Sequence, residues 1–251
     1  MKKRLLLLPI FASLTLTGCE ITLFGKTIKL FEPSSTDSLD LPANFKQEID
    51  GYKMATSLKD GGEYILGVYR VNEDVMRFAD GNYHSDDNGQ YSFYLGTSTD
   101  ISEAAIVKAK SLGDGEFSLQ MIAKGKVWHN KYIAVYNAKS SYGNDVMSIA
   151  ALDELDQTTF TTINRKTTTT VTAVTQTHFK YYETYEDMPA YSVGAMYEHE
   201  GIDLSGPVPK FIGTGHNTNE DEADYISMDC KTYEVALELS SYDLAHLYEK
   251  K

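Results

Sequence analysis

The sequence predicts an all-β domain with few short helices, an antiparallel sandwich or barrel, with a β-trefoil as the alternative. Three observations predict this class. Apolar and polar residues alternate with a period of two through much of the chain beyond residue 50. Turn sequences such as DGG, DGN, DDNG and GDG separate the alternating segments. The chain also contains 18 tyrosines, and aromatic residues favour strands.

Four segments show the alternation most clearly. They are EYILGVYRV at 63–71, YSFYL at 91–95, EFSLQMIA at 116–123 and TYEVALEL at 232–239. In the third segment Phe117, Leu119 and Met121 share one face. Ser118 and Gln120 share the opposite face. Such alternation is typical of half-buried antiparallel strands.

Two further segments need separate interpretation. The Thr-rich stretch 158–177 is predicted to be a hairpin that turns near Asn164-Arg165, with threonines on a solvated face. Residues 100–112 carry helix signals, with Asp100 as a possible N-cap and Glu103 three positions later. The same segment also alternates as a strand would, so it fits either a short helix or a strand.

The first 19 residues have the features of an export signal. Basic residues 2–4 precede the uncharged run 5–17, which is shorter than the ~20 residues that span a bilayer. The run ends in Leu16-Thr17-Gly18-Cys19, which resembles the lipobox of bacterial lipoproteins. The resemblance implies cleavage before Cys19 and acylation of its thiol, as in palmitate-bearing lipoproteins. Two or more acyl chains give stable anchoring in the lipid bilayer.

This resemblance divides the chain into three parts. Residues 1–18 are a signal peptide that is removed, residues 19–49 are the lipidated N-terminus and a tether, and residues 50–251 are a single β-rich domain. The tether segment EPSSTDSLDLPANFK is rich in Ser, Asp and Pro and has no period. We therefore expect an exported protein, lipid-anchored to a bacterial membrane on its periplasmic or cell-surface side.

The charge excludes one class of partner. The net charge is −13, and removal of residues 1–18 leaves 20 basic against 36 acidic residues, a balance of −16. Nucleic acid is excluded because phosphate contacts need lysine and arginine. Anionic headgroups also repel this chain, so the lipid must supply the anchoring. With Cys19 acylated, Cys230 has no partner for an intrachain disulfide and is predicted to be a small buried residue.

Short motifs in the body resemble an uncharacterised β domain of secreted and surface proteins of gut bacteria. They are YKMATSLKDGGEYILG at 52–67, AAIVKAKSLGDGEFSLQ at 104–120, NKYIAVYN at 130–137 and LYEKK at 247–251. The resemblance implies a β fold over residues 51–251 with an insertion somewhere in 164–220. It implies no particular activity.

The sequence predicts no catalytic residue, metal site or cofactor. Ser192 in AYSVG matches a variant of the nucleophile elbow, but that motif needs a strand that leads into a helix. His199 in YEHEG lacks the H-E-x-x-H spacing of zinc sites. The acidic stretches NTNEDEAD and HSDDNG do not match the twelve-residue calcium loop. The sequence leaves enzyme activity undecided and favours a non-catalytic protein.

Aromatic residues are the candidate ligand contacts. One interpretation places Trp128, Tyr132 and Tyr136 in a sugar platform, since flat aromatic faces stack on the C–H patches of sugar rings. The competing interpretation puts Trp128 in the core, with a turn at His129-Asn130, and buried tryptophans are common. Tyr83 and His84 are the alternative contacts, in a predicted loop.

These observations favour a membrane-anchored lipoprotein with a non-catalytic β domain that binds a glycan or protein ligand. Two alternatives stay open. One is an envelope-associated hydrolase with paired carboxylates, which the 36 acidic residues do not allow us to locate. The other is an envelope assembly or scaffold component that uses exposed edge strands.

Overall fold

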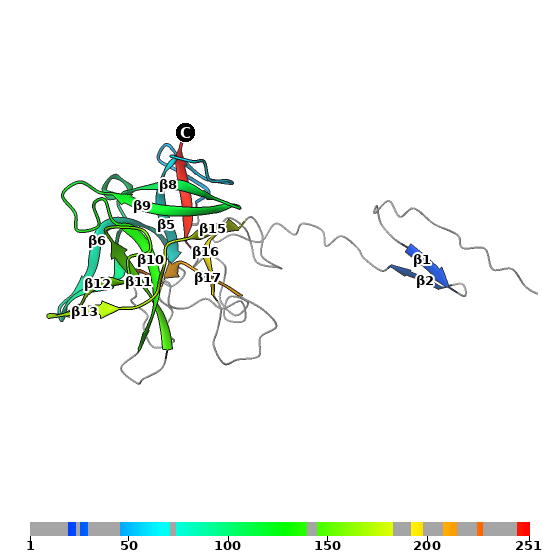
Figure 1. The fold of residues 1–251 in the computed structure, drawn as a ribbon. Coiled ribbons are helices and arrows are strands. Elements are labelled where there is room, and N and C mark those ends of the chain that lie inside the picture. Colours follow the sequence, from blue (N-terminus) through cyan, green and yellow to red (C-terminus); the bar gives the residue numbers. More distant parts are fainter. Residues whose placement is uncertain are drawn as a thin grey trace, which may run out of the picture. The chain divides into compact units, whose positions relative to one another are not determined.

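The structure is a computed structural model that describes residues 20–23, 26–29, 46–70, 74–139, 145–182, 192–197, 208–214, 225–227 and 245–251. The chain divides into two compact units, Met1–Leu41 and Pro42–Lys251 (Figure 1). In the first unit, β1 (Glu20–Leu23) and β2 (Lys26–Lys29) form an antiparallel hairpin. Cys19, Cys230, His199 and the predicted strand 232–239 lie outside the described residues.

The second unit confirms the all-β prediction. Its strands are β3 (Glu48–Ile49), β4 (Tyr52–Met54), β5 (Glu63–Arg70), β6 (Val75–Asp86), β7 (Gly89–Ser98), β8 (Ile106–Gly113), β9 (Glu116–Ile122), β10 (Tyr132–Lys139), β11 (Asp145–Leu152), β12 (Thr159–Arg165), β13 (Thr167–Thr172), β14 (Thr175–Gln176), β15 (Phe179–Tyr182), β16 (Ser192–Tyr197), β17 (Val208–Phe211), β18 (Gly213–Thr214), β19 (Tyr225–Ser227) and β20 (His246–Lys250). No helix in the described ranges is long and apolar enough to cross a membrane.

The strands form an open, sandwich-like antiparallel sheet. Hairpins join neighbours such as β5–β6, β6–β7, β8–β9 and β10–β11, and β20 pairs with both β4 and β5. The ladders branch at β5, β7, β9 and β10, each of which pairs with three strands. Among the strands described, no series of ladders returns to its starting strand. The barrel alternative is therefore wrong, and so is the β-trefoil, which is built around a closed barrel.

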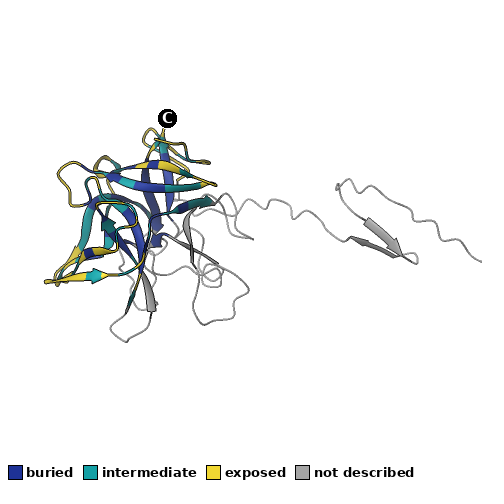
Figure 2. Ribbon diagram, in the orientation of Figure 1, coloured by how far each residue is buried: buried dark blue, intermediate teal, exposed yellow. Residues whose placement is uncertain are grey.

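The core explains why the sheet has a sandwich-like form. A main cluster, which contains Leu66, Leu119 and Val135, joins β5, β9 and β10 through their inward faces. A second cluster covers the opposite face of β5 through Ile65 and Tyr69. The prediction of half-buried strands therefore fails for β5, whose nearly continuous apolar sequence suits a strand buried on both faces (Figure 2).

A third cluster lies on the outer face of β10 and β11. Tyr136 of β10 packs there against Phe160 of β12, with ring centroids 4.9 Å apart and an angle of 74° between the planes. The β12–β13 hairpin thus covers the side of β10 that faces away from the main cluster. Its turn, where Arg165 has a φ of 60°, confirms the hairpin predicted in the Thr-rich stretch.

The ambiguous segment 100–112 contains both predicted elements. The Asp100 side chain accepts a hydrogen bond of 2.9 Å from the backbone N–H of Ser102 and caps a single 3₁₀ turn, η1 (Ile101–Glu103). Strand β8 follows, with Val107 and Ala109 fully buried. The helix extends over one turn only. Beyond it the chain forms a strand, because the alternation with a period of two places both of these side chains in the core.

The burial of both faces of β5 gives a test at Gly67. A Cβ at this position would lie 2.9 Å from Tyr248 Cε2 and 3.0 Å from Phe78 Cε1, both on fully buried rings. We expect Gly67→Ala to lower the free energy of unfolding by about 1–3 kcal/mol, the usual cost of overpacking. An uncrowded strand glycine would instead gain stability on this change. Denaturant unfolding gives the sign, and a stabilised variant would contradict the packing described.

Candidate functional site

The predicted platform of Trp128, Tyr132 and Tyr136 does not exist. Trp128 is 0% exposed and belongs to the main cluster, whereas Tyr136 is buried in the third cluster on the other face of β10. Only Tyr132 is half-buried. The core interpretation of Trp128 is therefore right.

The chain near Trp128 explains this burial. Its backbone N–H donates to the Gly81 carbonyl at 3.0 Å, and its carbonyl accepts from the Lys131 N–H at 3.0 Å. Asn130 has a φ of 61°, which confirms the predicted turn at His129-Asn130. The turn folds back against β6, so the indole ring enters the core.

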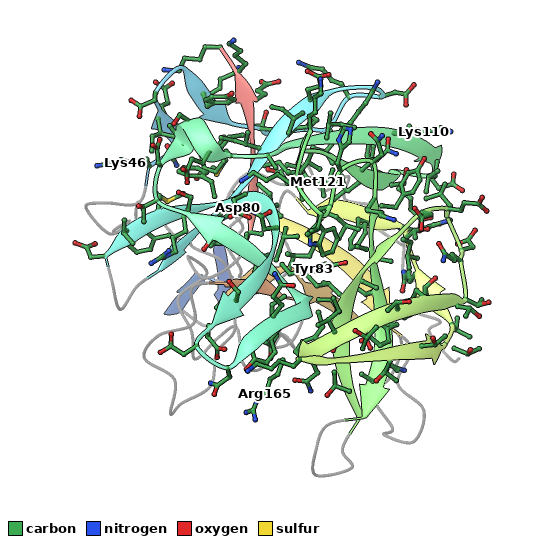
Figure 3. All side chains as sticks on the ribbon, turned by 90° about the vertical axis from the view of Figure 1, so that its left-hand side faces the viewer. Lys46, Asp80, Tyr83, Lys110, Met121 and Arg165 are labelled. Atoms are coloured by element: carbon green, nitrogen blue, oxygen red, sulfur yellow. The ribbon has the colours of Figure 1, made fainter. Side chains whose placement is uncertain are left out.

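Tyr83 and His84 lie on β6 rather than in the predicted loop, and both are half-buried. The Tyr83 ring meets the edge of Trp128 with centroids 6.1 Å apart. Burial raises the pKa of Tyr83, and Asp153 adds to the rise while Lys131 opposes it. Tyr83 therefore serves as a packing residue above the core, and Figure 3 shows it near the middle of the view.

A bulge in β7 gives His84 a different role. Tyr83 stands opposite Leu95 in the β6–β7 ladder, but the next residue, His84, stands opposite Tyr91. The three residues Ser92, Phe93 and Tyr94 are therefore extra on the β7 side. Bulges of this kind redirect side chains and are frequent beside functional sites.

The bulge gathers His84, Tyr91, Phe93 and Tyr94 into one group, which we call the aromatic cluster. His84 stacks on Tyr91 with centroids 5.8 Å apart and an angle of 26° between the planes. Phe93 meets Tyr94 edge-on at 4.5 Å, and Tyr94 lies 6.0 Å from Tyr91. All four side chains are half-buried, so each keeps part of its surface in solvent.

Ser92 fixes the bulge to the β12–β13 hairpin. Its hydroxyl oxygen accepts a hydrogen bond of 2.7 Å from the backbone N–H of Ile163, and the side chain is buried. The backbone of β12 continues alongside β7, with Asn164 opposite Tyr91. Gly89 permits this approach, because a Cβ there would lie 2.6 Å from the Arg165 carbonyl oxygen. The aromatic rings are thus held by backbone contacts on both sides.

Polar groups border the aromatic cluster. The Tyr91 hydroxyl donates to Asp86 Oδ2 at 3.2 Å and accepts from Arg165 Nε at 3.4 Å. Burial raises the pKa of the Asp86 carboxyl, but the hydrogen bonds that it accepts outweigh this effect and leave the pKa below its usual value. Asp86 is therefore a carboxylate at neutral pH. The border offers one charged acceptor and one charged donor beside four ring surfaces.

Sequence reasoning found His84 but missed Tyr91, Phe93 and Tyr94. Alternation in the segment YSFYL predicts a regular strand, which places Phe93 and Tyr94 on opposite faces. The adjacent aromatic pair was the available signal, since two large neighbouring rings rarely both fit the core of a two-sided strand.

The structure tests two of the sequence motifs within the residues that it describes. Ser192 is the first residue of strand β16, so it does not stand between a strand and a helix as a nucleophile elbow requires. In the described part of the chain, no three His, Cys, Asp or Glu side chains gather as a metal site.

No family model, no curated protein and no solved structure matches this chain. The aromatic cluster and its border are suited to stacking on the apolar face of a ligand while they hydrogen-bond its polar groups. The geometry thus supports non-covalent binding.

The burial of Trp128 generates a direct test. Trp128→Ala should lower the free energy of unfolding by roughly 3–5 kcal/mol, because it removes a large ring from a closed core. As the chain has one tryptophan, its emission reports on this residue alone. We expect blue-shifted emission that resists quenching by acrylamide. Red-shifted, readily quenched emission would contradict the core position.

Proposed function

We propose that this protein is a lipid-anchored bacterial lipoprotein whose exported β domain binds a glycan through the aromatic cluster. The observation that carries the binding proposal is the bulge in β7, which presents four half-buried rings on a rigid strand pair. Rings fixed in this way lose little conformational freedom on binding, which favours affinity.

A glycan suits this site better than a protein partner. Sugar rings present apolar C–H faces that stack on aromatic rings, and their hydroxyls both donate and accept hydrogen bonds. Asp86 and Arg165 supply one acceptor and one donor at the border. A protein interface needs a larger contact area, on the order of 800 Å² per partner.

The anchoring part of the proposal rests on the lipobox resemblance at residues 16–19 and on the tether that follows it. A lipid anchor would hold the domain near the envelope, and the tether would let the aromatic cluster reach ligands beyond the headgroups. The strong negative charge of the chain supports anchoring through lipid rather than through the protein surface.

One observation favours the scaffold alternative. Strand β13 pairs only with β12 among the strands described, and residues 167–170 are exposed and uncharged. An unprotected strand edge of this kind can pair with a strand from another chain.

The aromatic cluster gives the functional test. We expect the full-length protein in detergent to bind a subset of an immobilised glycan array. Tyr91→Ala should weaken this binding roughly tenfold, since it removes a stacking ring and the hydroxyl that links Asp86 with Arg165. Tyr91→Phe keeps the ring, so it should lose less glycan binding than Tyr91→Ala does.

Val174→Ala, which alters a residue 87% exposed elsewhere, is the control and should bind as the wild type does. Equal binding by wild type and Tyr91→Ala would contradict the proposal. If no glycan is bound at all and the protein instead self-associates through β13, the scaffold alternative gains support.

Anchoring is tested at Cys19. Cys19→Ser removes the thiol that accepts the lipid, so the variant should leave the membrane fraction or accumulate unprocessed. Cys230→Ser changes the other cysteine and should stay in the membrane fraction. Labelling with radioactive palmitate followed by fractionation distinguishes these results. A Cys19→Ser variant that still carries label would show that the lipobox interpretation is wrong.

A further inference from the structure

We propose that a second site, on the outer face of β8 and β9, binds an acidic sugar whose carboxylate is held by Lys108 and Lys110. The site is a shallow depression of about 310 Å³. Its polar lining residues are Asp60, Lys108, Lys110, Ser118, Gln120 and Tyr132. This volume is at the lower end of the range for small-molecule sites and suits a ligand of one or two rings. We call it the lysine depression.

The sheet register brings these residues together. Lys108 stands opposite Gln120, and Lys110 stands opposite Ser118 across the β8–β9 ladder. Tyr132 of β10 continues the row beside Gln120. Because Val107, Ala109 and Leu119 point into the main cluster, the alternating residues must face outward.

The turn before β5 closes one side of the depression. The Gly61 backbone N–H donates to the Ala109 carbonyl at 2.8 Å, which holds the turn against β8. Asp60 Oδ1 accepts from the backbone N–H of Ser111 at 2.9 Å. This bond fixes the carboxylate and leaves its second oxygen for a ligand.

The two lysines lack a carboxylate partner. Both side chains are exposed, and neither forms an ion pair or hydrogen bond within the part of the chain that the structure describes. Glu63 stands opposite Lys108 in the β5–β8 ladder but pairs with neither lysine. Elsewhere, Lys53 and Lys59 both contact Glu249 at 3.1 Å. Lys108 and Lys110 thus present two ammonium groups on the same face of β8 within the depression, an arrangement that suits an anionic ligand.

Ser118 supplies an independent observation. Its residue is 1% exposed, although it lies on the outer face of β9, and its hydroxyl has no hydrogen-bond partner among the described residues. A buried polar group without a partner is uncommon and calls for an explanation. Since Ser118 lines the depression, a ligand oxygen at its floor would provide the missing hydrogen bond.

The remaining groups select a sugar acid over an inorganic anion. The Asp60 carboxylate repels a bare phosphate or sulfate, but it accepts hydrogen bonds from ligand hydroxyls. Gln120 donates through Nε2 to the Asn130 carbonyl at 3.1 Å, so its carboxamide oxygen is another acceptor. Half-buried Tyr132 offers an aromatic surface for the C–H face of a ring. A uronic acid combines the carboxylate, the hydroxyls and the ring that this lining requires.

The lysine depression and the aromatic cluster share no residue. Lys110 and Arg165, one from each site, lie far apart in the view of Figure 3. The inference rests on the proposed function only in taking the ligand to be a saccharide, so the two can fail separately.

The test is calorimetric titration of the full-length protein in detergent with glucuronate, glucose and inorganic phosphate. Glucuronate should bind roughly tenfold more tightly than either of the others, since only it satisfies both the lysines and Asp60. The double variant Lys108→Gln/Lys110→Gln should lose about tenfold or more in glucuronate affinity. The control Lys124→Gln/Lys126→Gln makes the same change of charge at two exposed lysines and should bind normally.

Two further variants sharpen the test. Ser118→Ala should weaken glucuronate binding with no loss of melting temperature, because the hydroxyl has no partner in the protein to lose. Asp60→Asn should weaken glucuronate binding and strengthen phosphate binding. Val174→Ala, which alters an exposed residue outside both sites, should leave glucuronate binding unchanged.

Several results would overturn the inference. Phosphate binding as tight as glucuronate binding would exclude a sugar acid as the ligand class. If the two lysine double variants lost equal glucuronate affinity, the loss would come from the change in net charge and not from Lys108 and Lys110 in particular. Loss of glucuronate binding in Tyr91→Ala would place the ligand at the aromatic cluster, which would overturn this inference and leave the proposed function intact.

Discussion

Burial of the main apolar cluster decides which face of each strand points inward. Both proposed sites lie on the strand faces that consequently point outward. On β8 and β9, Val107 and Leu119 enter the core, so Lys108 and Ser118 must face out. On β10, Val135 enters the core, so Tyr136 faces out and needs a separate cover. The period of two in each strand therefore specifies the outer surface as strictly as it specifies the core.

The β12–β13 hairpin, which covers the outer face of β10 at Tyr136, also contacts the aromatic cluster. Phe160 near its start packs on Tyr136, and Ile163 further along donates its backbone N–H to Ser92 in the β7 bulge. One hairpin thus buries the outer face of β10 and also holds the bulge that directs the aromatic rings. A bulge alone would leave backbone groups unpaired and free to rearrange. The hairpin pairs these groups through the hydrogen bond to Ser92 and the ladder beside Tyr91, and so holds the bulge in place.

Local patterns in the sequence predict most elements but not how they pair. Alternation predicts the strand at Leu119 and the hairpin near Arg165. Asp100 indicates the N-cap of a helix, and that helix ends after one turn. The open form of the sheet depends on ladders between strands far apart in the chain, so sequence left sandwich and barrel undecided. The same holds for the sites. The bulge in β7 becomes visible only when β7 is paired with β6, where His84 stands opposite Tyr91. The lysine depression likewise forms only when β8, β9, β10 and the turn at Asp60 come together.

The two sites depend on different forces, which matters for so acidic a chain. At physiological ionic strength, charges more than ~8 Å apart are largely screened, so the negative charge of the whole chain acts weakly on a ligand already seated between Lys108 and Lys110. Those two ammonium groups act within contact distance, where screening is least effective, and Asp60 then discriminates between ligands that carry hydroxyls and ligands that do not. The aromatic cluster offers uncharged ring surfaces for stacking, a contact that salt does not screen. A saccharide with both neutral and acidic rings would therefore match the local chemistry of each site, although the protein as a whole repels anions.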